Sequence, residues 1–546
     1  MHWGRDKRMK MTIIGAAHQV TGSCTMLEWL PERYLLIDCG MEQGENDYVM
    51  SELPVPAGMI EYVVLTHAHI DHSGNLPLLY QQGFRGKIYA THETVNLCSI
   101  MLADSAHIQE TDAAYQTKKN QRTGLPEVKP AYTAEDAANV MKLFRPCEYG
   151  KIIQIDEGLS IRLTDAGHLL GSSFVEFFLE ENGQKVKLVC SGDVGNTNQP
   201  IIQDPQPVAE ADYLLIESTY GTRLHHGSGN PIPLLVSILD RTFHRGGSVI
   251  IPSFAVGRTQ ELLYFFREIK QQHLLPFYSD FPVYVDSPLA NEATAIFLQC
   301  ETACLDEDAR AVMKEGANPI WFDGLHTVVS SEESKALNAN EKPKVIIASG
   351  GMCEGGRIRH HLKHNLWNEK NTVMFAGYQA AGTLGRIIYD GTKEVKILGE
   401  TIDVKAEITL LDGISGHADQ AGLLNWINQF SKKPSMIFVN HGDEDSCTGF
   451  AEIIHSNTGI EAMAPYSGSE YDLLKHEWIR LTAPVYKTHN KKAAADSDVP
   501  ANKKETLYRE LLQAAEMLNN AVRDMKDHSN SEIKSMTKKI RDLMDD

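Results

Sequence analysis

Length, composition and charge exclude several classes of protein for this chain. Its 546 residues are too many for one ordinary domain, and a hydrophobic content of 42% suits two or three globular domains. No apolar run reaches the roughly 18 residues of a membrane span, so we expect no membrane partner. The net charge of −20 argues against nonspecific binding of a polyanion.

Cysteine usage and the N-terminus predict a cytoplasmic protein. The nine cysteines are odd in number and form no C-x-x-C pair, which argues against a disulfide framework or a thiolate zinc site. The N-terminal segment MHWGRDKRMKMTIIG is basic but lacks an apolar stretch before a cleavage site, so we expect no signal peptide.

The first part of the chain is predicted to alternate strands with polar loops. Residues 11–30 predict a hairpin, and residues 93–149 are mostly helical and polar. An exposed loop is expected from Lys118 to Lys129, where Gly124 and Pro126 break a helix. Further apolar strands end in polar residues, in YLLIDCG, MIEYVVLTHAHIDH, IIQIDEGLSIRLTDAGH, KVKLVCSGDVG and DYLLIESTYG.

From about residue 218 the pattern changes to strands separated by helices, which predicts parallel β-α units in a doubly wound sheet. After about residue 398 the chain returns to strands with one helix. Residues 485–504 are polar and Ala-rich, as in a linker. Residues 505–544 have the apolar spacing of one or two amphipathic helices, which we expect to pack on the body or on a partner subunit. The expected boundaries are 11–217, 218–398, 399–484 and 485–546.

The segment THAHIDHSG carries the strongest chemical signal, with His67, His69, Asp71 and His72. Imidazoles and a carboxylate are good zinc ligands. Side chains two apart on an extended chain point the same way, so His67 and His69 can reach one ion. Asp71 and His72 come after the strand end and can turn to a second ion.

Other candidate residues are scattered along the chain, and most directly follow an apolar strand. Alone, each would be a cap or turn residue, but together with the His-rich segment they predict a metal site at one sheet edge. They are Asp38, His168, Asp193, Glu217, His417 and His441.

These motifs resemble the metallo-β-lactamase superfamily, specifically its β-CASP family of nucleases. The resemblance covers roughly residues 11–470 and includes GAAHQVTGSC, the acid of LLIDCG, the H-x-H-x-D-H core, IPSFAVGRTQE, VDSPLA and SGGMCEGGRIRHHL. The chain is particularly similar to prokaryotic relatives of the nuclease subunit that cuts pre-mRNA at its 3′ end. The implied fold is an αββα sandwich in two parts (11–217 and 399–484), with an inserted β-CASP α/β cap (218–398) and a C-terminal helical tail.

The resemblance also implies two zinc ions per chain that share a water or hydroxide. Asp71 is expected both to bind metal and to handle a proton, and His417 is expected to donate a proton while Glu217 holds its ring. The implied ligands are His67, His69 and His168 for one ion, Asp71, His72 and His441 for the other, and Asp193 as the bridge, with Asp38 orienting a ligand.

Two Gly-rich loops are candidates for binding RNA phosphates, because free N–H groups at a helix start attract anions. RNA is expected to thread between the cap and the sandwich, where a narrow cleft suits single strands. The candidates are Ser253, Gly257 and Arg258 in the first loop, Ser349, Gly350, Gly351, Arg357 and His361 in the second, and, on a weaker signal, Arg386.

The implied activity is zinc-dependent cleavage of single-stranded RNA, with internal cutting favoured over 5′-3′ exonucleolytic cutting. A DNA-directed nuclease is the first alternative, but RNA-processing members of the family carry His where His441 stands. A hydrolase of small esters is disfavoured by the inserted cap, and a noncatalytic scaffold is disfavoured because every ligand position is filled. Manganese or iron in place of zinc and a homodimer both stay open.

Overall fold

The computed structural model describes residues 9–44, 46–225, 230–380 and 382–487, together with Lys534 and Thr537. The chain divides into two compact units, Met1–Tyr486 and Lys487–Asp546. Of the expected linker at 485–504, residues 485–487 are described, and Tyr486 forms an antiparallel β-bridge with Tyr48. The rest of the linker and the expected amphipathic helices of residues 505–544 lie outside the described residues, except that Lys534 and Thr537 are helical. No helix among the described residues is long and apolar enough to cross a membrane.

The first layer of the sandwich is an eight-stranded mixed sheet. Strands β1 to β3 pair antiparallel and β3 to β6 pair parallel. In order across the sheet, the strands are β23 (Glu477–Arg480), β22 (Glu470–Asp472), β1 (Lys10–Ile13), β2 (Thr25–Leu30), β3 (Arg33–Ile37), β4 (Ile60–Val64), β5 (Lys87–Thr91) and β6 (Phe144–Cys147).

The second layer is a seven-stranded sheet that combines strands from both ends of the unit. Strands β10, β11 and β20 run parallel although β11 and β20 are far apart in sequence. In order, the strands are β21 (Glu461–Met463), β20 (Met436–Asn440), β11 (Tyr213–Glu217), β10 (Gln184–Cys190), β9 (Ser173–Glu181), β8 (Leu159–Asp165) and β7 (Ile152–Asp156).

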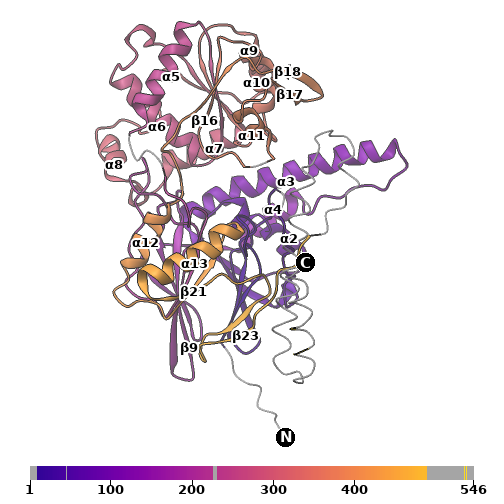
Figure 1. The fold of residues 1–546 in the computed structure, drawn as a ribbon, viewed down its shortest axis with the longest axis vertical. Coiled ribbons are helices and arrows are strands. Elements are labelled where there is room, and N and C mark those ends of the chain that lie inside the picture. Colours follow the sequence, from indigo (N-terminus) through magenta and orange to yellow (C-terminus); the bar gives the residue numbers. More distant parts are fainter. Residues whose placement is uncertain are drawn as a thin grey trace. The chain divides into compact units, whose positions relative to one another are not determined.

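A continuous apolar core joins the two sheets, with Leu27 and Leu35 from one layer and Phe177, Leu188 and Phe438 from the other. Helices cover the outer faces of both sheets (Figure 1). On the first sheet lie α1 (Ile70–Ser73), α2 (Leu76–Gln81), α3 (His92–Gln121) and α4 (Ala134–Val140), and on the second lie α12 (Gln420–Asn428) and α13 (Glu444–Thr458). The expected αββα sandwich is confirmed.

Residues between β11 and α12 form the inserted domain, whose six-stranded sheet is entirely parallel. Its central strands VIIPS and VIIAS are apolar on both faces because helices cover both faces. The order is β14 (Leu325–Thr327), β13 (Val283–Asp286), β15 (Val345–Ser349), β12 (Val249–Ser253), β16 (Thr372–Phe375) and β19 (Glu407–Leu410).

The inserted domain contains seven further helices among the described residues, and a short hairpin of β17 (Glu394–Ile397) and β18 (Glu400–Asp403). The helices are α5 (Ile232–His244), α6 (Arg258–Gln271), α7 (Pro288–Gln299), α8 (Glu307–Lys314), α9 (Ser331–Ala339), α10 (Ile358–Asn365) and α11 (Leu384–Tyr389). Single 3-10 turns are η1 (Ala57–Met59), η2 (Met141–Leu143), η3 (Pro276–Tyr278) and η4 (Thr302–Cys304).

Two expected boundaries differ from the structure. Strand β19 pairs parallel with β16, so the inserted sheet continues past residue 398, where we expected it to end. The apolar positions of EITL pack on this sheet and not on the sandwich. The loop expected from Lys118 also starts later, because α3 continues to Gln121 through good helix formers and ends before Gly124.

Candidate metal centre

The His-rich segment follows β4 at the carboxyl end of the strand. Thr66 to His69 form a loop, and α1 begins at Ile70, so the four candidate side chains leave the backbone in two directions. His67 and His69 lie before the helix, whereas Asp71 and His72 lie in its first turn. This break from loop to helix separates one pair of ligands from the other.

The remaining candidates reach the same edge of the sandwich from other strands. Asp38 follows β3, His168 follows β8, Asp193 follows β10 and His441 follows β20. Because β3 runs parallel to β4, and β10 runs parallel to both β11 and β20, their carboxyl ends meet at common edges. The structure therefore brings residues that are up to several hundred positions apart into one cluster.

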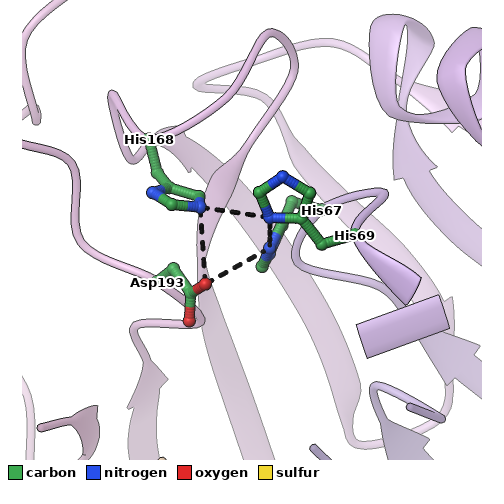
Figure 2. A group of neighbouring side chains, drawn as sticks. All are labelled: His67, His69, His168 and Asp193. Atoms are coloured by element: carbon green, nitrogen blue, oxygen red, sulfur yellow. Dashed lines mark hydrogen bonds and ion pairs between the residues drawn. The ribbon is translucent and has the colours of Figure 1, made fainter. Parts of the chain in front are cut away.

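The first group of potential metal ligands consists of His67, His69, His168 and Asp193, whose ligand atoms all lie within 4.8 Å of one another (Figure 2). His69 Nδ1 lies 3.1 Å from His67 Nε2 and 3.2 Å from His168 Nε2. Asp193 Oδ2 lies 3.4 Å from the Nε2 atoms of both His67 and His168. Three nitrogens and one oxygen thus converge on a common point.

A second group consists of Asp71, His72 and His441. The Nε2 atoms of His72 and His441 are 3.1 Å apart, and Asp71 Oδ2 is 3.7 Å from His441 Nε2. Asp193 Oδ1 lies 3.3 Å from His72 Nε2. The two oxygens of Asp193 therefore face different groups, which is the arrangement of a bridging carboxylate.

These spacings fit a metal ion. Ligands at 2.0–2.1 Å from a tetrahedral zinc lie about 3.3 Å from one another, and the first group has contacts of 3.1 to 3.4 Å. Asp193 Oδ1 is buried and accepts no well-formed hydrogen bond within the described part of the chain. A buried carboxylate oxygen without a hydrogen bond is costly unless a cation compensates it.

Hydrogen bonds to Nδ1 orient three of the imidazoles. His168 Nδ1 lies 3.0 Å from the Gly416 carbonyl oxygen, and His67 Nδ1 lies 3.1 Å from Thr66 Oγ1. His72 Nδ1 lies 2.7 Å from Asp38 Oδ2. Each ring can donate through Nδ1, which leaves the Nε2 lone pair facing the cluster.

Asp38 is buried and holds more than one element of this edge. Its Oδ1 accepts hydrogen bonds from the backbone N–H and the hydroxyl of Thr66, at 2.8 and 3.0 Å. Its Oδ2 accepts a bond of 3.1 Å from Ser23 Oγ in addition to the contact with His72. Asp38 therefore contacts a candidate ligand and the loop that carries two others, and it lies in neither ligand group.

The electrostatics of the first group favour neutral imidazoles. Burial lowers the pKa of His67, His69 and His168, and for His67 the nearby His72 lowers it further. Burial alone would raise the pKa of Asp193, but the charges of His441 and His72 hold it well below its usual range. Neutral imidazoles next to an ionised carboxylate are the protonation states that bind zinc.

Glu217 and His417 form a third polar pair beside Asp193. Glu217 Oε1 is 3.1 Å from His417 Nδ1 and accepts a 2.6 Å bond from the Val194 backbone N–H. Burial lowers the pKa of His417, but Glu217 and then Asp193 outweigh it and raise the pKa to about 9. The three side chains also satisfy the spacing of a metal group. Glu217 already accepts backbone hydrogen bonds from Val194 and Thr219, so we interpret the pair as a positioned proton donor.

The first Gly-rich loop lies next to the metal cluster. Gly257 caps α6, and a Cβ atom there would lie 3.1 Å from the Leu169 side chain, beside His168. Ser253 ends β12 and is buried, while the Arg258 guanidinium is paired with Glu261. The loop has the expected position, but its cation is already neutralised.

The second Gly-rich loop differs from the expectation. Ser349 ends β15, and Gly350 and Gly351 follow it, whereas α10 begins only at Ile358, so these residues do not form its N-terminus. The Gly350 N–H donates to the Ser253 carbonyl oxygen at 3.2 Å, which joins the two loops.

His361 is not a phosphate ligand in this structure. Its side chain is fully buried, with Nε2 2.6 Å from Asp286 Oδ2 and Nδ1 2.9 Å from Asn338 Oδ1. Arg357 donates to Asp286 Oδ1 at 2.5 Å and to the Val329 carbonyl oxygen at 2.6 Å. Asp286 at the end of β13 thus contacts both residues and is the counterion of Arg357. Arg386 is likewise paired with Asp390, at 2.8 Å.

Several residues of this region were missed from the sequence. Thr66 is the first residue of the His-rich segment and directly precedes His67, so its hydroxyl was a recognisable partner for the first imidazole. The contact of the Gly416 carbonyl oxygen with His168 joins residues 248 positions apart and has no local signal. Phe254 and Tyr378 follow β12 and β16 as exposed aromatic side chains, each 52% exposed, although aromatic residues usually lie inside.

Comparisons with known proteins agree with this geometry. Family models match residues 19–122 (metallo-beta-lactamase superfamily), 259–388 (Beta-Casp domain) and 401–465 (Zn-dependent metallo-hydrolase RNA specificity domain). The chain is 36% identical over 450 residues to a ribonuclease of Thermus thermophilus, covering 82% of this chain and 96% of that protein. It is 30% identical over 473 residues to transcription termination factor FttA of Methanosarcina mazei, covering 84% and 71%.

Proposed function

Because the chain belongs to the β-CASP family of the metallo-β-lactamase superfamily, and is a metal-dependent hydrolase, we propose that it cleaves phosphodiester bonds of single-stranded RNA with two zinc ions per chain. The observation that carries the proposal is the pair of ligand groups that share Asp193 beside the Glu217–His417 pair. The match to an RNA specificity domain covers residues 401–465, which include His417 and His441.

The metal ligands are proposed from the measured spacing. His67, His69 and His168 would hold one ion, Asp71, His72 and His441 the other, and Asp193 both. Bound zinc would supply Lewis-acid polarisation of a phosphate and lower the pKa of a water molecule. Asp38 keeps His72 in place through the contact of 2.7 Å to its Nδ1.

His417 is the proposed proton donor to the leaving oxygen of the RNA. Its Nδ1 faces Glu217, and its Nε2 has no hydrogen-bond partner among the described residues, so Nε2 is available to a substrate. Burial lowers the pKa of the ring, but Glu217 outweighs it and favours the protonated form that a proton donor needs. Glu217 is fully buried and bonded to the Val194 N–H, so it fixes His417 relative to the adjacent Asp193.

Exposed aromatic side chains favour single strands as the substrate. Phe254 belongs to the loop whose Gly257 packs on Leu169, the residue after His168. Burial raises the pKa of Tyr220, and the nearby Tyr378 raises it further. The Tyr220 ring is 6.1 Å from that of His417. Unpaired bases can stack on such faces, whereas bases inside a duplex cannot.

We propose internal cleavage, with 5′-3′ exonucleolytic cleavage as the rival mode. The test uses end-labelled single-stranded RNA and matching DNA, with and without chelator, beside a His69→Ala/Asp71→Ala double variant. The expected result is RNA cleavage that chelation and the double substitution both abolish, with products of internal length. If zinc-loaded protein leaves RNA intact but cleaves DNA, the proposal that RNA is the substrate is contradicted.

A further inference from the structure

The far end of α3 forms an exposed arm, which we define as residues 114–131 and call the α3 arm. Figure 1 shows α3 as a long helix whose far half extends past the sheet that it covers. Ala113 is the last buried residue of the helix, and no residue from 114 to 131 is buried. Tyr115 is 67% exposed and Leu125 is 59% exposed. The arm thus contributes almost nothing to the core.

The α3 arm nevertheless has a fixed shape. After Gln121 the chain turns and runs back along the helix. Thr117 Oγ1 accepts a hydrogen bond of 2.9 Å from the Val128 N–H, and Asn120 Nδ2 donates to the Pro126 carbonyl oxygen at 2.8 Å. The Leu125 N–H donates to the Asn120 carbonyl oxygen at 3.0 Å. These bonds hold the returning segment against the helix, so the arm presents a defined surface.

The α3 arm is basic in an acidic chain. It carries four cations and one anion, Glu127, which gives a net charge of +3 in a chain of −20. Within the described residues, none of the four cations forms an ion pair. They are Lys118, Lys119, Arg122 and Lys129.

The arginines that the sequence suggested as phosphate ligands are paired instead. Arg258 is paired with Glu261, Arg357 with Asp286, and Arg386 with Asp390. Their charge is therefore largely neutralised within the protein. The two lysines at the end of α3 also complement the negative end of the helix, but Arg122 and Lys129 lie beyond it and have no such role.

The other end of α3 is anchored at the metal centre. Thr91 and Thr94 donate hydrogen bonds from their hydroxyls to the Gly171 carbonyl oxygen, at 2.6 and 2.8 Å, in the loop that carries His168. The 24 residue steps from Thr94 to Lys118 rise about 36 Å along the helix. One rigid helix thus sets the distance between the metal centre and the arm.

We propose that the α3 arm is a second RNA-binding site, which holds the phosphate backbone of a long single strand about 36 Å along α3 from Thr94, the residue that contacts the loop of His168. The proposal rests on the proposed function. Four unpaired cations provide the phosphate contacts, and Tyr115 provides a face for a base. Each phosphate contact contributes about −0.7 to the salt dependence on a single strand, so the arm contributes a slope of about −3.

The distance also predicts which RNAs the arm can bind while they are being cut. At about 3.4 Å per stacked nucleotide, 36 Å corresponds to roughly 11 nucleotides. A substrate of five nucleotides cannot reach from the metal centre to the arm. The arm should therefore distinguish long RNA from short RNA and leave the chemistry unchanged.

The test compares two full-length quadruple variants with the same change in charge. K118Q/K119Q/R122Q/K129Q removes the arm cations and keeps good helix formers. K314Q/K335Q/K342Q/K393Q removes four exposed lysines of the inserted domain that form no ion pair within the described ranges. Binding of a 30-nucleotide RNA is measured in chelator from 50 to 200 mM salt, and cleavage of 30- and 5-nucleotide RNAs is measured with zinc.

The arm variant is expected to bind the 30-nucleotide RNA roughly 10- to 100-fold more weakly, with a salt slope shallower by about 3. Its cleavage of the 5-nucleotide RNA should equal wild type, and the control variant should stay within about twofold on both RNAs. Equal binding by both variants would overturn the proposal, as would a change in oligomeric state without a change in RNA affinity. Absence of cleavage by wild type with intact binding would refute the proposed function and leave the arm supported.

Discussion

The metal centre and the Gly-rich loops of the inserted domain use polar side chains in opposite ways. At the metal centre, the partners of His67, His69 and Asp193 are mostly other candidate ligands, so the group needs an external cation to be satisfied. In the loops, Arg258 and Arg357 are satisfied by Glu261 and Asp286 of the same domain.

This difference separates residues that act on a ligand from residues that hold the fold together. Both regions lie at carboxyl ends of strands and both are rich in charge, so sequence composition alone does not distinguish them. The partners do. A charged side chain with an internal counterion is a weaker candidate for substrate binding than one that faces only like groups.

The largest effect is expected for Asp193→Asn, which keeps the shape but removes the bridging charge. Loss of metal should remove several kcal/mol of charge stabilisation and lower kcat by roughly 10³-fold or more. Metal content and RNA cleavage measure the effect. Asp212→Asn is the matched control, because Asp212 pairs with Lys432 at the surface, at 2.8 Å. Full metal content and full activity in the Asp193 variant would show that the two groups do not share a ligand.

If His417 is a proton donor, substitutions in the Glu217–His417 pair should reduce activity without loss of metal. Glu217→Gln and His417→Ala should each lower kcat by roughly 10²- to 10⁴-fold while the metal content stays at the wild-type value. The double variant should lose little more than His417→Ala alone, because Glu217 acts through His417. Loss of one metal ion in either single variant would instead make this pair a metal ligand.

In the inserted domain we expect a substitution to reduce stability and to leave RNA cleavage nearly unchanged. Asp286→Ala leaves Arg357 and His361 without their buried counterion, so the free energy of unfolding should fall by about 3 kcal/mol. RNA cleavage by the folded protein should change little. Urea unfolding and cleavage assays measure both quantities. If an Arg357→Gln variant has normal stability but binds RNA poorly, Arg357 is an RNA-binding residue after all.

The sequence predicted the metal cluster better than the phosphate loops, for a physical reason. Asp38 and His441 directly follow apolar strands, Asp193 comes three residues after one, and the carboxyl ends of parallel strands meet at one edge. The pairing of Arg357 with Asp286 joins positions far apart in the sequence and depends on how β13 and β15 pack. That information is absent from either segment alone.

Long-range packing also limits how much of the fold the sequence predicts. The family resemblance implied the αββα sandwich, but nothing in the sequence placed β19 in the inserted sheet, because half-buried residues such as those of EITL suit either sheet. The end of α3 was predicted more closely. Gly124 and Pro126 indicated a break, and the helix ends at Gln121, shortly before them. Local signals set where elements end more reliably than which layer they join.

The smallest effect concerns Glu444, a partly buried carboxylate three residues after His441. Glu444 begins α13 and accepts hydrogen bonds of 2.8 Å from Tyr48 and Tyr466, with His18 2.9 Å away. Burial would raise the pKa of Glu444, but His18 and the tyrosines lower it to about 2. A depressed carboxyl pKa stabilises the folded state above the unfolded pKa near 4.5 and loses that effect as the pH falls toward 2.

Glu444→Gln should therefore reduce the free energy of unfolding at pH 7 by about 1 kcal/mol, because the side chain is partly exposed and screened by solvent. The difference from wild type should shrink between pH 4.5 and pH 2. Unfolding measured across this range checks the prediction, with the exposed Glu477→Gln as control. A difference that does not depend on pH would assign Glu444 a packing role only.

Metal titration tests the central claim most directly. Chelator-treated protein is given zinc in steps from zero to four equivalents per chain, and RNA cleavage and bound metal are measured at each step. Two ligand groups that share Asp193 predict that activity rises until two ions are bound per chain and then stays constant. Full RNA cleavage at one bound ion, or without metal, would contradict the account.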